Sequence, residues 1–183
     1  MKALFQKYRS VLKFILVFLL VYGILTIAYK FYLDFSKGGA YYPDYLTLTV
    51  AQQSKALLDA VGYDTVVEPH SNEASLKLIV RGKFVARVVE GCNAISVIIL
   101  FVSFIVAFSG RPKTTFFYSL AGSVLLYSVN LVRIAILSIG LFHYPWRKET
   151  LHKVIFPLLI YGMVFLLWMV WVKRFSTLNK KHG

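Results

Sequence analysis

Four apolar stretches dominate this sequence, and each is close to the roughly 20 residues that an α-helix needs to cross the hydrocarbon core of a bilayer. Of its 183 residues 58% are hydrophobic and only 16% are charged, and the mean hydropathy is +0.65, which is too apolar for a soluble domain of this length. We therefore predict an all-α integral membrane protein with four transmembrane helices. The four stretches are residues 11–29, 92–108, 115–142 and 154–172.

The first stretch follows a basic start, MKALFQKYRSVLK, as the apolar region of a secretory signal does. It is longer than such a region, and no cleavage pattern of small residues follows it. We therefore expect residues 1–29 to form a cytoplasmic N-terminus and a retained signal-anchor helix.

The formal net charge of +13 raises the question of nucleic-acid binding, but the basic residues are concentrated in particular segments that flank the apolar stretches. Ten of them, with no acidic residue, lie in the N-terminal flank, the loop SGRPKT at 109–114 and the tail at 173–183, whereas residues 30–91 have no net charge. Because basic loops stay in the cytoplasm, we expect both termini and the 109–114 loop to face inward and residues 30–91 and 143–153 to face outward. The charge thus indicates topology in a cytoplasmic (inner) membrane, and nucleic acid is not an expected partner.

The outward-facing segment at 30–91 is too short for a large core of its own, and we predict a small α+β unit. In residues 42–63, YPDYLTLTVAQQSKALLDAVGY, apolar side chains recur near helical spacing after Pro-Asp, and a glycine follows, which predicts an amphipathic helix on the membrane surface or on the other helices. Residues 76–91, LKLIVRGKFVARVVEG, alternate around Arg-Gly-Lys and predict a β-hairpin. The apolar helical positions are Leu46, Val50, Ala51, Leu57, Leu58 and Val61.

Arg133 lies inside an otherwise apolar stretch, YSVNLVRIAILSIG. A cation at that position costs about 2.5–3.5 kcal/mol on insertion scales at the helix centre, unless it reaches the interface or a partner. We therefore treat Arg133 as a functional candidate, and Asn130, three residues earlier on the same helix face, as a residue that can bind the same partner. The alternative is that Arg133 extends to the interface and fixes helix packing.

Cys92, Arg133 and His152 are expected at one level of the membrane. Arg133 lies 18 residues after the start of the third stretch, which is about 27 Å along a helix and near the outer boundary. Cys92 begins the second stretch and His152 precedes the fourth at that same boundary. A thiolate can attack a carbonyl while an imidazole carries the proton, and a helix start or a nearby cation favours the thiolate. Arg133 can instead, or as well, stabilise an oxyanion.

Several of these residues have simpler explanations. A single cysteine is often a small packing residue; it excludes an internal disulfide and a multi-cysteine zinc cluster, and we expect no metal or cofactor. Glu90 can orient the histidine, bind a basic part of a substrate, or face water. Asn93 is more readily a cap of the second helix than a catalytic group. His143 competes with His152, although it can belong to an interfacial group with Tyr144 and Trp146. The remaining histidines, His70 and His182, are expected to be solvated.

Three motifs, EGCNAISV (90–97), NLVRIAIL (130–137) and HKVIF (152–156), occur in this order at the outer ends of successive stretches. In this arrangement the chain resembles the exosortase and archaeosortase family, and is most similar to the short members called exosortase type F. The resemblance covers roughly residues 89–172. EGCNA lacks the Ser-Gly that often follows the family's cysteine, and longer members have more membrane spans.

The resemblance implies a cysteine-dependent transpeptidase with Cys92 as nucleophile, Arg133 as activating or oxyanion-stabilising cation and His152 as proton carrier. Residues 92–172 would then be a three-helix catalytic core, followed by a basic cytoplasmic tail at 173–183. Family substrates are membrane-anchored secreted proteins with a C-terminal sorting signal, and the acyl group passes to an envelope glycan or lipid. Two other functions stay open, a non-catalytic membrane scaffold subunit and a thiol-dependent lipid acyltransferase.

Overall fold

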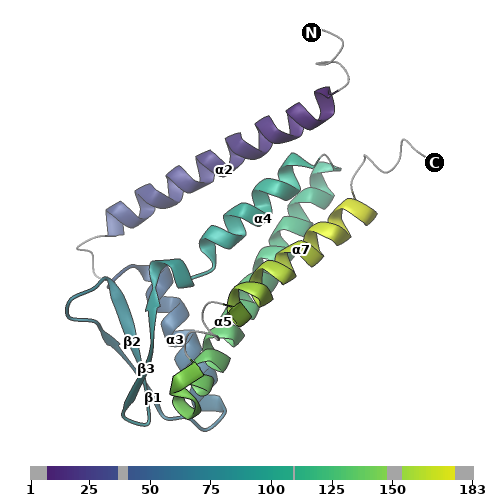
Figure 1. The fold of residues 1–183 in the computed structure, drawn as a ribbon. Coiled ribbons are helices and arrows are strands. Elements are labelled where there is room, and N and C mark those ends of the chain that lie inside the picture. The colour runs from purple at the N-terminus through teal and green to yellow at the C-terminus, as the bar shows by residue number, and fades with distance from the viewer. Residues whose placement is uncertain (1–7, 37–40, 109, 148–153, 176–183) are drawn as a thin grey trace.

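The structure is a bundle of helices with a small α+β segment at one end (Figure 1). The computed structural model describes residues 8–36, 41–108, 110–147 and 154–175. The elements are α2 (Arg9–Ser36), α3 (Tyr45–Ala60), β1 (Thr65–Pro69), β2 (Ser75–Val80), β3 (Lys83–Val89), the 3-10 helix η1 (Glu90–Cys92), α4 (Ile95–Ala107), α5 (Pro112–His143), the 3-10 helix η2 (Pro145–Arg147) and α7 (Phe156–Arg174).

Within the described residues, three helices are long and apolar enough to cross a bilayer, namely α2, α5 and α7. The second predicted span forms α4, whose 13 residues extend about 20 Å, less than the ~30 Å of the hydrocarbon core. Four full spans are therefore not confirmed. By contrast, the 32 residues of α5 extend about 48 Å. This is longer than the hydrocarbon core of a bilayer, so part of α5 must lie outside that core.

The predicted amphipathic helix is present as α3, which packs on α5. Its N-cap is Asp44, whose carboxylate accepts a hydrogen bond from the backbone N–H of Thr47 at 3.0 Å. The buried face includes Val50, Ala51 and Leu58 as expected. Leu57 and Val61, also assigned to that face, are 38% and 62% exposed, and Val61 is the C-cap residue that follows the helix.

The predicted hairpin is confirmed as β2 and β3, joined by Arg81 and Gly82, which both have positive φ. A third strand, β1, was not predicted. It pairs antiparallel with β2, so the strand order in the sheet is β1-β2-β3. The joint from α3 into β1 is held by Asp59, which accepts hydrogen bonds from Lys55 and from the backbone N–H of Thr65. The Lys55 hydrogen bond is the main cause that lowers the pKa of Asp59.

Residues of α5 contribute to four hydrophobic clusters, of which the two largest lie in the bundle and against the sheet. In the bundle, α4, α5 and α7 enclose Phe101, Leu126 and Trp171, all 0% exposed. At the other end of α5, Ile134 completes a core formed by α3 and the sheet, with Val50, Leu76, Leu78 and Val88. The segment at 30–91 therefore depends on α5 for its core, as its short length led us to expect.

Candidate active site

Cys92 lies in an irregular turn between the sheet and α4. It is the last residue of η1, is half-buried, and packs against the core of the α+β segment. Two residues later Ala94 has φ +66°, a left-handed conformation that a residue with a Cβ rarely adopts. The first turn of α4 was expected to contain Cys92, but Ala94 delays the helix to Ile95, so the thiol precedes it by three residues.

Asn130 on α5 connects this turn to Arg133. Asn130 is only 1% exposed, and its Nδ2 donates a hydrogen bond of 2.7 Å to the backbone oxygen of Cys92. Its Oδ1 accepts a hydrogen bond of 3.3 Å from the Arg133 guanidinium. The predicted proximity of Asn130 and Arg133 is confirmed, and one buried amide brings the Cys92 turn and the cation together.

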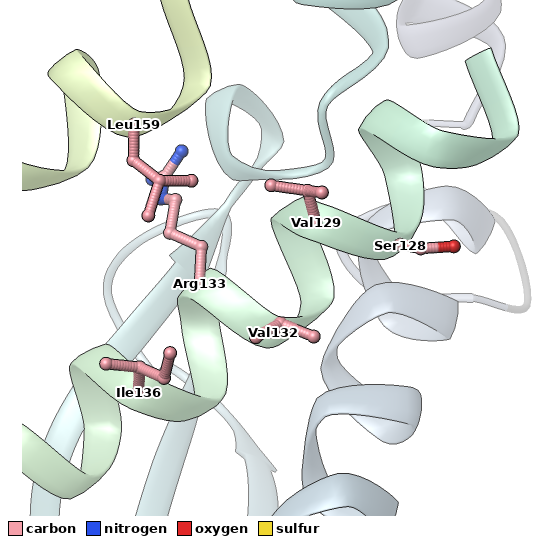
Figure 2. Close-up of a pocket in the computed structure, with 6 residues that line it drawn as sticks. All are labelled: Ser128, Val129, Val132, Arg133, Ile136 and Leu159. Carbon is pink, nitrogen blue, oxygen red and sulfur yellow. The ribbon is translucent and has the colours of Figure 1, made fainter. Parts of the chain in front are cut away.

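Arg133 lines a pocket of about 210 Å³ between α5 and α7. In Figure 2 its side chain extends from α5 toward Leu159 on α7, with Val129, Val132 and Ile136 forming the apolar wall. Val132 and Ile136 are about half exposed, so the pocket opens at the surface of the bundle. Ser128 points away from the guanidinium and donates its hydroxyl to the backbone oxygen of Val124. The site therefore combines a cation with an apolar wall.

Asn93 holds the other side of the Cys92 turn. It is 1% exposed, and its Oδ1 accepts a hydrogen bond of 3.1 Å from the backbone N–H of Ile95, the first residue of α4, although the N-cap position itself is Ala94 and not Asn93 as predicted. Its Nδ2 donates to the hydroxyl of Tyr29 on α2 at 2.7 Å and lies 3.4 Å from the Thr47 hydroxyl on α3. The sequence did not single out Tyr29 or Thr47, because contacts across 64 and 46 residues leave no local pattern.

Glu90 opens the same 3-10 turn and is half-buried, so it lies close in the chain to Cys92. Among the residues that the structure describes, no group of three or more His, Cys, Asp or Glu side chains is arranged to hold a metal ion.

The two candidate histidines differ in what the structure describes. His143 ends α5, is exposed, and its Nε2 lies 2.8 Å from the Tyr63 hydroxyl. It is 13 residues beyond Asn130 on the same helix, which is about 20 Å along the axis. The structure therefore places His143 far along α5 from the Cys92 turn. His152 lies outside the described residues; it precedes α7, the helix whose Leu159 lines the Arg133 pocket.

The chain was compared with models of protein families. Residues 6–173 match the transmembrane exosortase model, a longer stretch than the 89–172 on which the sequence resemblance rested. The match does not distinguish the type F members. No curated protein and no solved structure matches the chain.

Proposed function

Because the chain belongs to the transmembrane exosortase family, we propose that it is a membrane cysteine transpeptidase that cleaves C-terminal sorting signals and transfers the product to an envelope acceptor. The observation that carries this proposal is the pair of hydrogen bonds from Asn130, one involving the Cys92 backbone and one Arg133. One buried side chain thereby links the turn that contains the proposed nucleophile to the proposed oxyanion-stabilising cation, and this proximity supports acyl transfer.

In the proposed reaction the Cys92 thiolate attacks the scissile carbonyl carbon, and the electron pair moves onto the oxygen. Arg133 stabilises that oxyanion. When the tetrahedral intermediate collapses, the C–N bond breaks, and His152 gives the departing amine the proton that it took from the thiol. An amine or hydroxyl of an envelope glycan or lipid then attacks the thioester carbon. His152 takes the proton of this acceptor, and the C–S bond breaks to release the Cys92 thiolate.

His152 is proposed over His143 as proton carrier. The hydrogen bond of His143 to Tyr63 and its ~20 Å separation along α5 from Asn130 support this choice. Glu90, in the same turn as Cys92, is proposed to orient the histidine or to bind a basic group of the substrate.

The proposed orientation follows the basic residues. Arg9, Arg111 and Lys173 lie at the ends of α2, α5 and α7 that are remote from the α+β segment, and we place these ends in the cytoplasm of an inner membrane. The Cys92 turn and the α+β segment then face outward. Within the family, the resemblance of the motifs favours the short type F members.

The test is Cys92→Ala in the full-length protein in its membrane. The variant is expected to insert normally while a protein with a C-terminal sorting signal accumulates uncut; Cys92→Ser serves as the isosteric control and is expected to be inactive as well. His152→Gln is expected to abolish cleavage, whereas His143→Gln is not. Processing that continues in Cys92→Ala would overturn the proposal and leave a scaffold subunit.

A thiol-dependent lipid acyltransferase is the second candidate, because the wall of the Arg133 pocket is apolar. Mass spectrometry of the adduct trapped on Cys92 separates the two reactions. A peptide thioester supports the transpeptidase, and a fatty acyl thioester contradicts it in favour of lipid transfer.

A further inference from the structure

The outer end of α2 carries polar contacts that the proposed reaction does not use. None of the residues of this helix is fully buried, as expected for an anchor surrounded by lipid. Two of its tyrosines nevertheless bond inward: Tyr29 accepts from the amide of Asn93, and Tyr32 donates to the carboxylate of Asp44. Their rings are stacked at 6.0 Å. The two hydroxyls therefore connect α2 to two different segments, one beside Cys92 and the other at the start of α3.

Tyr32 serves the start of α3. Its hydroxyl contacts Asp44 at 3.2 Å and accepts from the backbone N–H of Leu46 at 3.2 Å, so it supports the N-cap of α3. Tyr29 instead reaches Asn93, the residue that directly follows Cys92. The same Nδ2 also donates to the Thr47 hydroxyl, at 3.4 Å. We call Tyr29, Thr47 and Asn93 the Asn93 cluster.

The backbone beside this cluster has a reason to need support. Ala94 at φ +66° stores strain of about 1–2 kcal/mol, which persists only where surrounding contacts determine the conformation. Asn93 has both ends of its amide engaged, one with the first N–H of α4 and the other with Tyr29. On the opposite side, Asn130 holds the Cys92 carbonyl. The turn is thus fixed from α5 and from α2.

We infer that Tyr29 and Asn93 are positioning residues for Cys92, so that α2 is part of the apparatus that presents the thiol and not only a membrane anchor. This inference rests on the proposed role of Cys92 as nucleophile. It predicts that removal of one hydroxyl on α2 alters the reactivity of a thiol 63 positions away in the sequence while substrate binding is unchanged.

The test uses Tyr29→Phe in the full-length protein in lipid vesicles. Cys92 is the only cysteine, so its alkylation by N-ethylmaleimide can be followed without other substitutions. We expect alkylation to become roughly ten-fold faster, because a loosened turn exposes the half-buried thiol, and kcat for cleavage of a sorting-signal peptide to fall roughly ten-fold at unchanged KM. A general loss of folding would instead lower the active fraction of the protein, which active-site titration measures.

Tyr32→Phe is the matched control. It removes the same hydroxyl three residues away and costs two hydrogen bonds, but those bonds serve the α3 cap. We expect its alkylation rate and kcat to stay within about two-fold of the wild type. If Tyr32→Phe changes both rates as much as Tyr29→Phe does, or if Tyr29→Phe changes neither, the inference is wrong.

Asn93→Ser separates the two functions of Asn93. Serine can still cap the N–H of Ile95, but its hydroxyl is too short to reach Tyr29. We expect Asn93→Ser to reproduce the effect of Tyr29→Phe, and the double variant to be no worse than Asn93→Ser alone, because the two substitutions remove the same Tyr29–Asn93 hydrogen bond. Additive losses contradict the inference. A Cys92→Ala variant that still cleaves substrate contradicts the proposed function itself, and so the two failures are distinguishable.

Discussion

The inner and outer halves of α5 are held in place by different forces. Toward the cytoplasmic end proposed here, Gly122 lies against the ring of Phe101, and the fit is so close that an added Cβ would be 2.3 Å from the ring. Toward the outer end, polar side chains take over: Tyr127 donates to Gln53, Asn130 to the Cys92 backbone, and His143 contacts Tyr63. Close packing dominates in the inner half, whereas in the outer half hydrogen bonds add to the apolar core that Ile134 forms with α3 and the sheet.

The outer contacts are also unequal among themselves. Asn130 is 1% exposed, whereas the Tyr127 and His143 contacts are open to solvent. Removal of one partner of a buried hydrogen bond leaves the other polar group unpaired, at a cost of about 1–3 kcal/mol. An exposed polar group that loses its partner can form a hydrogen bond with water instead. The proposed activity should therefore be sensitive to substitution of Asn130 and tolerant of substitution of Tyr127 and His143.

The largest effect is expected for Arg133→Lys, which keeps the charge but loses the planar fork. Loss of an oxyanion donor lowers kcat about 100- to 1000-fold, and single-turnover cleavage of a sorting-signal peptide measures it. Arg111→Lys, at the N-cap of α5, is the control and should be active. A loss of less than about three-fold for Arg133→Lys would mean that the charge serves helix packing alone.

Asn130→Leu is expected to come next, with a fall in kcat of about 10- to 100-fold, because the Cys92 carbonyl is left unpaired and Arg133 loses an acceptor. Tyr127→Phe removes the exposed contact to Gln53 and should change kcat by less than about two-fold. Equal effects of the two substitutions would remove the distinction between buried and exposed contacts on α5.

Gly122→Ala tests the inner half. The new Cβ would overlap Phe101, so unfolding in mixed micelles should require about 1–3 kcal/mol less, while kcat per folded molecule is unchanged. Gly23→Ala on α2 meets nothing within 4 Å and is the control. Phe101→Leu in the same chain should restore part of the stability. A change in kcat rather than in stability would contradict the division of α5 into two halves.

The smallest effect is expected for His143→Gln. The His143 side chain is exposed, and its partner Tyr63 can bind water instead. The cleavage rate should therefore stay within about two-fold of the wild type at each pH tested. A ten-fold loss would make His143, and not His152, the proton carrier.

Local patterns predicted most of the fold. Apolar length predicted α2, α5 and α7, and Arg-Gly-Lys predicted the hairpin, since each depends on neighbouring residues. The second stretch forms a shorter helix than predicted, because apolarity cannot reveal the left-handed Ala94 that precedes α4. β1 was missed because TVVEP is short and ends in proline.

The candidate site could be predicted only in part. Asn130 and Arg133 share a helix face, so their proximity follows from spacing. The acceptor of Asn130, by contrast, is the backbone oxygen of Cys92, and every residue has such an oxygen, so no sequence pattern marks it. The contact of Tyr29 with Asn93 also leaves no sequence pattern, because 64 residues separate the two. His152 as proton carrier stays a prediction.

The length of α5 has a mechanical consequence. One unbroken helix of 32 residues joins the hydrocarbon region to the sheet, so no hinge separates them. Bilayers of different thickness change the tilt of a long helix. If Cys92 acts as proposed, we expect lipid composition to change, through α5, the height and angle at which the thiol is presented to a substrate.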